Sequence, residues 1–305
     1  MTLQLEKSTD NWSEWLLGRR HGNDSAYQRR MLEVVRRYRD RVLDGAKLRE
    51  GMTLADVGTG DGLLAFGAIE RIGPTLQVVL TDISEPLLRH VEETAEKFGV
   101  SEQCRFVQGS ADKLAGIDDA SVDAVGVRAV LAYVGDKAAA FREFYRVLRP
   151  GGRMSIAEPI FQDEAFEACA LGKIVQMQPN RPDIEFLKLV QRYRSAQFPA
   201  THEEAMRNPI TNYNERDLFR FARDAGFVNL HLELHIDLQP ALPISWEAYL
   251  DVANHPWAPT LREILAERFS KEEAEVFTRT LKPVVENGQS VQKQLTVYIT
   301  ADKPE

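Results

Sequence analysis

The chain has 305 residues, and its 38 Lys and Arg against 46 Asp and Glu give a formal net charge of −8. Hydrophobic residues make up 44% of the sequence and charged residues 28%, which is ordinary for a soluble globular protein. The acidic balance argues against a broad basic surface for nucleic acid. No apolar run approaches the roughly 20 residues that a membrane span needs, so we expect no membrane partner.

The start of the chain and its two cysteines bear on location and redox state. Residues 1–15 lack the apolar core of a secretory signal, so we expect a cytoplasmic protein. Cys104 and Cys169 have no neighbours at metal-ligand spacing, and we expect both to be reduced, structural thiols.

Residues 1–49 are predicted to form a helical N-terminal segment. Residues 1 to about 24 contain Trp12 and Trp15 and are too apolar for a free tail. Two interpretations are open: a helix packed on the outside of the fold, or a flap over the active site with His21 facing the pocket. In residues 25–49, apolar side chains recur at three- and four-residue steps, which predicts a helix with an arginine-rich opposite side.

Residues 50–160 alternate between short apolar runs and amphipathic stretches, which predicts strands alternating with helices. Such a series implies an α/β fold with a doubly wound, mostly parallel sheet, which we expect to have seven strands in all. The predicted strands are residues 53–57, 77–80, 104–108, 122–127 and 153–157, and the predicted helices are residues 63–71, 86–98 and 138–148.

The remainder of the chain is predicted to contain two helical insertions and the last two strands. Residues 161–211 break the regular alternation, and residues 212–239 return to the sheet with a helix after Asn214 and a strand at 228–238. That strand is predicted to place its apolar residues on one side and its polar residues on the other. Residues 240–290 form the second insertion or lid, and residues 291–305 hold the last strand.

The stretch LADVGTGDGLL, residues 54–64, predicts a buried strand, a glycine-rich turn and a helix. Glycines at alternate positions allow a ligand to approach the backbone closely. The third glycine comes one residue earlier than in the dinucleotide fingerprint, and Asp61 would repel a pyrophosphate. A cationic cofactor without phosphate, S-adenosylmethionine, therefore fits the turn better.

Polar residues follow the next three strands, where the carboxyl edge of the sheet would gather them. Asp82 lies 20 residues after Gly62 and is suited to accept hydrogen bonds from a ribose diol. Asp112, after the third strand, is placed to accept from an adenine amine, and Arg128 follows the fourth strand beside the transferable group.

Together DVGTGDG, the acid in LTDIS, the GSAD turn and the segment from VGVRAV to RVLRPGGRMSIAEP resemble the class I S-adenosylmethionine-dependent methyltransferases. They are most similar to the branch that includes the ubiquinone and menaquinone biosynthesis C-methyltransferases. The resemblance covers residues 50–160 well and residues 212–238 loosely. It implies a Rossmann-like methyltransferase fold. It also implies a methyl-transfer reaction that converts S-adenosylmethionine to S-adenosylhomocysteine.

The resemblance also implies which residues would bind the cofactor. The glycine turn would hold its methionine end, Asp82 its ribose, and Ile83 and the turn after the third strand its adenine. Arg128 would lie near the methionyl group or the substrate. The implied set is Asp56, Gly58, Thr59, Gly60, Gly62, Asp82, Ile83, Ala111, Asp112 and Arg128.

In-line transfer from a sulfonium needs mainly alignment and exclusion of water, although the acceptor can also need a base. Candidates for that base are Glu158 at the end of the fifth strand, His21 on the proposed flap and Tyr133 after the fourth strand. A row of His231, Glu233, His235 and Asp237 resembles metal ligands, but side chains on one strand face lie roughly 6.5–7 Å apart. We therefore predict no metal.

The leading hypothesis is O-, N- or C-methylation of a small-molecule acceptor. A cofactor-binding sensor or scaffold, a nucleotide-dependent oxidoreductase and a macromolecular acceptor remain as alternatives, and a homodimer stays open. Aromatic residues are expected to line the acceptor pocket. The candidates are Trp12, Trp15, Tyr193, Tyr213, Trp246 and Trp257.

Overall fold

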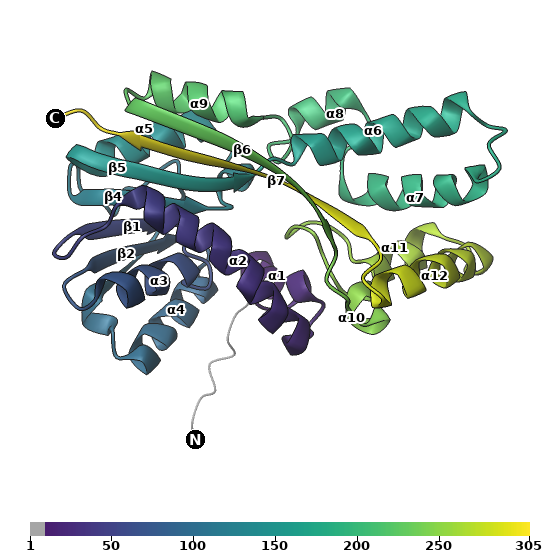
Figure 1. Cartoon of the computed structure of the whole chain (residues 1–305), viewed down its shortest axis with the longest axis horizontal. Helices are drawn as coiled ribbons and strands as arrows, with labels where there is room; N and C mark the ends of the chain where they lie inside the picture. Colours follow the sequence, from purple (N-terminus) through teal and green to yellow (C-terminus); the bar gives the residue numbers. More distant parts are fainter. Residues whose placement is uncertain (1–9) are drawn as a thin grey trace.

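The computed structural model describes residues 10–305, so the first nine residues of the predicted N-terminal segment lie outside the described residues. One seven-stranded sheet has the order β3-β2-β1-β4-β5-β7-β6. Strands β1 to β5 are parallel, and β7 pairs antiparallel with both β5 and β6. The predicted seven-stranded, mostly parallel sheet is confirmed (Figure 1).

The strands lie close to their predicted positions, and the last three are longer than predicted. They are β1 Thr53–Val57, β2 Gln77–Asp82, β3 Cys104–Gln108, β4 Val122–Arg128, β5 Leu148–Pro159, β6 Val228–Pro240 and β7 Val291–Asp302. The helices that flank the sheet are α1 Asn11–Leu17, α2 Ser25–Ala46, α3 Leu63–Ile72, α4 Glu85–Phe98, α5 Lys137–Val147 and α9 Glu215–Asp224. Short 3₁₀ turns are η1 Arg19–His21, η2 Ser101–Gln103 and η3 Leu131–Tyr133.

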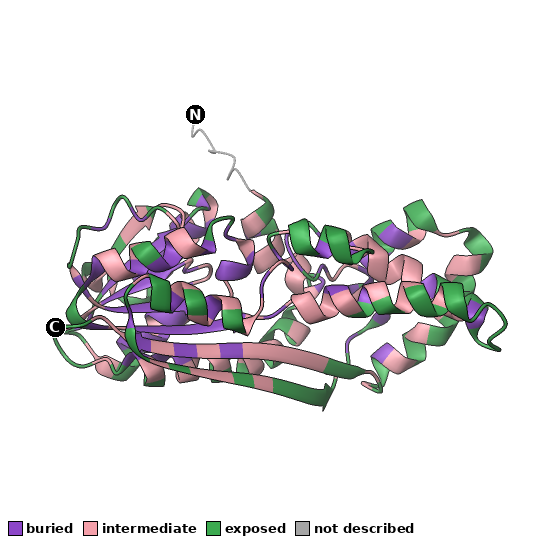
Figure 2. Ribbon diagram, turned by 90° about the horizontal axis from the view of Figure 1, so that it is seen from above, coloured by how far each residue is buried: buried purple, intermediate pink, exposed green. Residues whose placement is uncertain are grey.

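Helices cover both faces of the sheet. On one face, Leu43 of α2, Leu64 of α3 and Val91 of α4 share a buried cluster with the strands. On the other face, Phe141 of α5 and Leu218 of α9 belong to a second buried cluster. Figure 2 shows the buried residues concentrated in this part of the molecule. The three-layer arrangement follows from strands that are apolar on both sides, since each face needs a cover.

The β6–β7 pair continues beyond the sheet as a two-stranded ribbon. Strand β5 ends at Pro159 opposite Thr296, whereas β6 and β7 stay paired as far as Pro240 and Val291. Helices α10 Trp246–Leu250, α11 Leu261–Arg268 and α12 Lys271–Glu286 follow the ribbon, and α6 Gln162–Met177, α7 Ile184–Gln197 and α8 His202–Arg207 follow β5 (Figure 1). Leu189 of α7 packs with Trp246 and Phe277 in a third buried cluster that joins the two insertions.

Two local predictions differ from the structure. Strand β5 begins at Leu148 instead of the predicted residue 153, and it includes the residues between the predicted helix and strand. In β6, a bulge between Val228 and His231 adds one residue, so Val228 lies on the side of His231 rather than with the other apolar residues. Farther along β6, Leu238 is 68% exposed because the ribbon has left the helices that cover the sheet.

Candidate functional site

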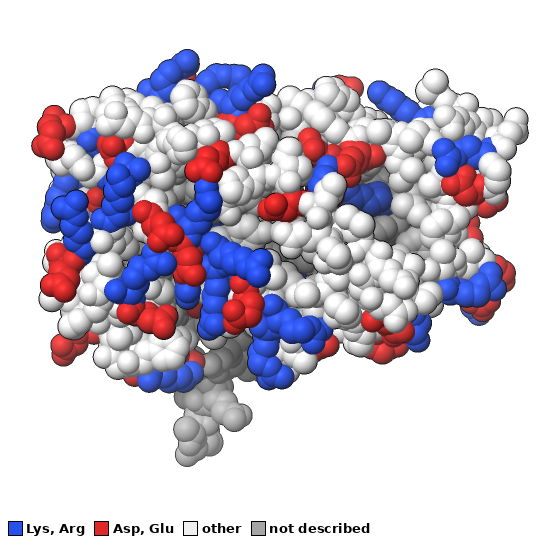
Figure 3. Space-filling model, viewed as in Figure 1, with Lys and Arg blue, Asp and Glu red and all other residues white. Residues whose placement is uncertain are grey.

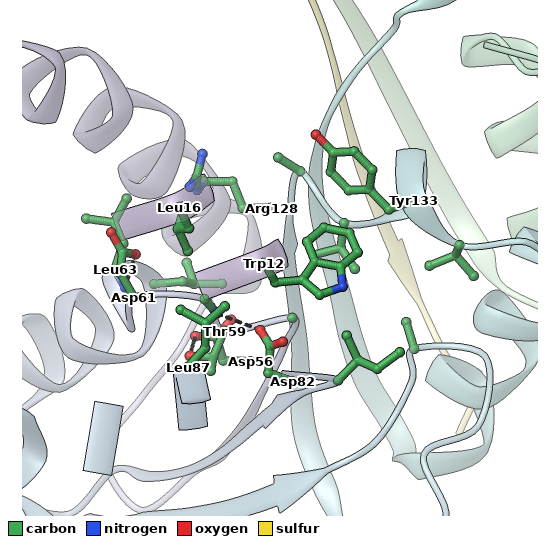
Figure 4. Close-up of a pocket in the computed structure, with 18 of the residues that line it drawn as sticks. Trp12, Leu16, Asp56, Thr59, Asp61, Leu63, Asp82, Leu87, Arg128 and Tyr133 are labelled. Carbon is green, nitrogen blue, oxygen red and sulfur yellow. Dashed lines mark hydrogen bonds between the residues drawn. The ribbon is translucent and has the colours of Figure 1, made fainter. Parts of the chain in front are cut away.

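A cleft lies at the carboxyl ends of β1, β2 and β4, where α1 crosses over them (Figure 4). About 990 Å³ of space lies between its walls, part of it open to solvent. From the sheet it is lined by Asp56, Gly58, Thr59, Gly60, Asp61, Asp82, Ile83, Gly109, Ser110, Ala111, Arg128, Ala129, Val130 and Tyr133. From α1 and η1 it is lined by Trp12, Trp15, Leu16 and Arg20.

The glycine turn folds tightly around the end of β1. Gly58 and Gly60 have φ values of 69° and 59°, and a Cβ at Gly58 would collide with the Val130 side chain. The buried Asp56 carboxylate accepts hydrogen bonds from Thr59 Oγ1 at 2.8 Å and from the Ala65 backbone N–H at 3.1 Å. Burial raises the pKa of Asp56 to about 7. A proton there is therefore exchangeable near neutral pH.

Asp82 ends β2 at the floor of the cleft. One carboxylate oxygen accepts from the Gly60 N–H at 2.9 Å, and the other accepts from the Ser84 N–H at 2.9 Å. Burial raises the pKa of this carboxyl group, while these two N–H groups favour its ionised form. Each oxygen keeps a further lone pair, so Asp82 can still accept from a ligand hydroxyl. Ile83, the next residue, also lines the cleft and is 54% exposed.

Two residues of the predicted cofactor set do not line the cleft. The Asp112 carboxylate accepts a hydrogen bond from Ser110 Oγ at 2.5 Å within the turn after β3. Gly62 has a φ of 79° and caps the start of α3. Asp56, Gly58, Thr59, Gly60, Asp82, Ile83, Ala111 and Arg128, the other eight, all line it.

Helix α1 is fixed over the cleft at both ends. Its N-cap Asp10 accepts from Ser84 Oγ at 3.0 Å, and Ser84 is also a hydrogen-bond partner of Asp82. At the other end, the Trp15 indole N–H donates to the Ala253 carbonyl at 2.8 Å. We call residues 10–22 the flap. It therefore connects the floor of the cleft with the second insertion.

His21, the predicted flap residue, does not line the cleft. Its ring lies 6.3 Å from the Tyr27 ring, and burial lowers the pKa of His21 to about 4. Arg20 lines the cleft instead, because in the turn η1 neighbouring residues project to different sides. The sequence prediction named His21 for its chemistry and missed Arg20, which looked like one more basic residue in the run Arg19-Arg20-His21.

Aromatic rings meet at one side of the cleft. The Trp12 ring is 5.1 Å from the Tyr133 ring and 5.0 Å from the Trp257 ring, both in edge-to-face contact (Figure 4 shows the first pair). Trp15 also lines the cleft, as predicted, but the prediction was wrong for Tyr193, Tyr213 and Trp246. Tyr213 is 2% exposed in the core, and Trp246 and Tyr193 pack in the cluster between the insertions.

Glu158 lies behind the cleft rather than in it. Its side chain is fully buried, and one oxygen accepts from the Val130 N–H at 2.8 Å. Among residues 10–305, its other oxygen has no hydrogen-bond partner. Burial raises the pKa of Glu158 to about 7, opposed by the N–H groups that begin η3. The carboxylate thus supports the loop after β4, which carries Ala129 at a φ of 55° and the ring of Tyr133.

Of the three candidate bases, Tyr133 alone lines the cleft. Burial raises the pKa of Tyr133 well above its ordinary value, so the hydroxyl keeps its proton at neutral pH. This makes the hydroxyl a poor base and leaves the ring as the useful part of the side chain.

The remaining sequence predictions concern metals, membranes and charge. Glu233 lies 3.2 Å from His231 and 3.1 Å from His235 and also pairs with Arg41. Within the described range, no cluster of three or more His, Cys, Asp and Glu has the geometry for a metal ion. Over the same range, no helix combines the length and hydropathy to span a bilayer. Figure 3 shows basic and acidic side chains interspersed on the face it presents.

Comparisons with known proteins agree with this geometry. A family model described as a methyltransferase domain matches residues 48–205. The ubiquinone/menaquinone biosynthesis C-methyltransferase UbiE of Escherichia coli O1:K1 is 35% identical over 117 residues, which cover 38% of this chain and 46% of the relative. The corresponding protein of Enterobacter sp. strain 638 is 32% identical over 147 residues, 46% of this chain and 58% of the relative. The chain thus spans about half the length of the curated relatives it matches.

Solved structures share the fold at low sequence identity. The YcgJ protein of Bacillus subtilis has a TM-score of 0.54 at 20% identity, covering 88% of this chain and 99% of that one. Phosphoethanolamine N-methyltransferase 2 of Haemonchus contortus, in complex with S-adenosyl-L-methionine, has a TM-score of 0.51 at 17% identity, covering 99% of this chain and 59% of that one. The family model covers more than half of the sequence, and the expected resemblance is confirmed. The chain belongs to the methyltransferase domain family, among the class I S-adenosylmethionine-dependent methyltransferases related to UbiE.

Proposed function

We propose that this chain transfers a methyl group from S-adenosylmethionine to a small-molecule acceptor held under the flap. The observation that supports this most directly is at the start of α3. The Ala65 N–H donates to Asp56, and the Leu63 N–H, at 3.3 Å, donates to Asp61. In a dinucleotide-binding fold, such N–H groups at a helix N-terminus hold the pyrophosphate. Here the chain's own carboxylates occupy them, which disfavours a nucleotide-dependent oxidoreductase.

The cleft suits each part of S-adenosylmethionine. Asp82 would accept from the ribose hydroxyls, and the exposed Ile83 side chain would pack on the adenine beside Ala111. Asp56, Gly58, Thr59 and Gly60 would surround the cationic methionine end, where Gly62 fixes the helix start. Arg128 would pair with the cofactor carboxylate. The prediction that Asp112 accepts from the adenine amine requires its bond to Ser110 to be shared or released.

The protein's contribution to catalysis would be alignment and exclusion of water. When bound, the cofactor supplies an already activated methyl group on its sulfonium, so no metal is required. The flap covers the cleft with Trp12, Trp15 and Leu16, and apolar walls keep competing water away from the methyl group. Glu158 would act as a positioning residue through the β4 loop. Neither Glu158 nor His21 lines the cleft.

The segments that would select the acceptor lie outside the part of the chain that matches the family model. The family model matches residues 48–205, so the flap, which precedes that range, and the second insertion, which follows it, lie outside the match. Trp12 of the flap lines the cleft, and Trp257 of the second insertion packs edge-to-face against its ring. C-methylation, the reaction in the relatives' name, is one candidate for this chain, and O- and N-methylation remain equal alternatives.

Calorimetry and turnover test the proposal. Purified protein is titrated with S-adenosylmethionine and with NADH, and S-adenosylhomocysteine release is then measured over a panel of phenols, amines, hydroquinones and organic acids. We expect binding of the methyl donor alone and turnover with at least one acceptor. If the protein binds NADH but does not bind S-adenosylmethionine, the result would favour an oxidoreductase. Donor binding without any turnover would favour the sensor or scaffold.

A further inference from the structure

Two arginines line the cleft without a counterion. Arg20 comes from the flap and Arg128 from the end of β4. Within residues 10–305, neither guanidinium forms a side-chain hydrogen bond or an ion pair within 4.0 Å. The Arg20 guanidinium carbon lies 5.4 Å from the centre of the Trp15 ring, which is a cation–π contact. Arg20 is therefore held by an aromatic ring and forms no ion pair, while Arg128 acts on the buried Asp56 and Glu158 only electrostatically.

The surroundings of Arg20 make this unpaired charge costly. Burial, followed by repulsion from Arg128, lowers the pKa of Arg20 to about 10, and Asp61 opposes that change. The guanidinium remains charged at neutral pH. Arg20 is half-buried, and it lines the cleft. A partly desolvated cation without a partner is typical of a site that receives an anion.

The acids of the cleft do not supply that anion. Asp56 and Asp82 accept hydrogen bonds from the backbone and from Thr59, and Asp61 accepts from the start of α3. Asp61 acts on Arg20 electrostatically but lies beyond ion-pair distance. The proposed cofactor carries one carboxylate, which Arg128 would pair with. A second guanidinium then remains for the acceptor.

We propose that the acceptor is a planar organic anion whose carboxylate pairs with Arg20 and whose ring lies against Trp12 and Tyr133. This inference rests on the proposed function and specifies its substrate class. A guanidinium matches a carboxylate with two parallel N–H···O bonds, which fixes the orientation of the bound molecule. The rings of Trp12 and Tyr133, 5.1 Å apart, offer an apolar surface for the rest of it. Arg20 would thus determine specificity without taking part in the chemistry.

In the competing arrangement, both arginines pair with the carboxylate of the cofactor. The affinity of the variants for S-adenosylhomocysteine distinguishes this arrangement from the proposed one. Calorimetry compares wild type with Arg20→Gln, Arg128→Gln and the control Arg29→Gln, which removes an exposed arginine of α2. We expect Arg128→Gln to weaken S-adenosylhomocysteine binding by about tenfold or more, as expected for a lost charge-assisted pair. Arg20→Gln and Arg29→Gln should stay within about twofold. Equal weakening by Arg20→Gln and Arg128→Gln would overturn the assignment.

A matched acid and amide then test the anion directly. Protein loaded with S-adenosylhomocysteine is titrated calorimetrically with 2-naphthoate and with 2-naphthamide, which has the same shape and no charge. We expect wild type and Arg29→Gln to prefer the acid by about tenfold, and Arg20→Gln to lose that preference. Equal binding of both probes, binding of neither, or a preference that survives in Arg20→Gln would refute the proposal. If S-adenosylhomocysteine itself fails to bind, the proposed function fails instead.

Discussion

The two sides of the cleft are built in different ways. The side proposed for the cofactor, here called the cofactor side, consists of strand ends and the turns that follow them, and its acids bind backbone N–H groups close by in the fold. The side proposed for the acceptor, here called the acceptor side, consists of the flap and the β4 loop, and the second insertion packs against the flap. Its contacts join residues as distant as Trp15 and Ala253. The first side is fixed by the sheet itself, whereas the second exists only after three separate segments have come together.

The cofactor side is expected to show the largest single effect. Replacing Asp82 with Ala removes the predicted partner of the ribose and the acceptor of two backbone N–H groups. Each bond to a charged group contributes about 1.5–3 kcal/mol, so binding of S-adenosylmethionine should weaken by about 100-fold or more. Calorimetry measures it. Asp118→Ala, an exposed acid before β4, is the control. Unchanged affinity in the Asp82 variant would contradict the assignment of the cofactor side.

Glu158 tests how the β4 loop, which belongs to the acceptor side, is held in place. Its pKa in the folded state, about 7, is above the ordinary value of 4.5, so the folded state holds the proton more tightly than the unfolded state does. Its contribution to stability is complete below about pH 4.5 and is lost as the pH rises to about 7. Glu158→Gln keeps a neutral side chain throughout. Relative to wild type, we expect the variant to gain roughly 1–3 kcal/mol of unfolding free energy between pH 5 and 8.

Urea unfolding at several pH values measures that difference, with the exposed acid Asp118→Asn as the control. If the stability difference between Glu158→Gln and wild type does not change with pH, the Glu158 carboxyl group is not protonated preferentially in the folded state. In that case the β4 loop must be supported in another way.

Asp56 allows the electrostatics of the cofactor side to be examined at finer scale. With a pKa of about 7, this carboxyl group is half protonated at neutral pH. The positive charges of S-adenosylmethionine favour its ionised form, so binding should release a fraction of a proton near pH 7. Affinity should then rise with pH by up to about tenfold per unit near pH 6. Titrations in phosphate and in Tris measure the proton count, and Asp56→Asn should abolish it. An unchanged count in that variant would assign the proton elsewhere.

The difference between the two sides also explains what the sequence could predict. The first strand, its glycine turn and Asp82 are adjacent in sequence to the elements that position them, and eight of the ten residues predicted to bind the cofactor line the cleft. Asp112 is the instructive exception. A partner only two residues away, Ser110, binds its carboxylate, and an acid in a turn looks the same in sequence whether it faces a ligand or the turn.

The acceptor side could be predicted only in outline. Aromatic content suggested pocket walls, but which aromatic rings reach the cleft depends on how the insertions pack. Tyr213 enters the core, and its hydroxyl donates to the Pro159 carbonyl at 2.8 Å. Trp257 is 52% exposed and joins Trp12. The interpretation in which His21 faces the pocket differs from the structure for a related reason, because a one-residue step around a 3₁₀ turn decides which side chain lines the cleft.

A moderate effect is expected where the flap is attached. Trp15→Phe keeps an aromatic ring and removes the indole N–H that donates to Ala253. A neutral hydrogen bond contributes about 1 kcal/mol, so opening of the flap should become about fivefold more frequent. Amide hydrogen exchange in α1 measures this, and α4 serves as an internal control. Identical exchange in variant and wild type would mean that the flap is held by its other contacts.

Tyr133 should give the smallest effect and distinguish a wall from a base. Its hydroxyl remains protonated, so Tyr133→Phe should keep methyl transfer to the best acceptor of the panel within about twofold. Tyr133→Ala removes the ring pair with Trp12, worth about 0.5–1.5 kcal/mol, and should weaken acceptor binding by up to about tenfold. If the Tyr133 hydroxyl were the general base, Tyr133→Phe would instead show the larger defect. Its turnover would fall by about 100-fold or more with little change in KM. The ratio of the two variants therefore decides the role, even if both proteins are somewhat less stable.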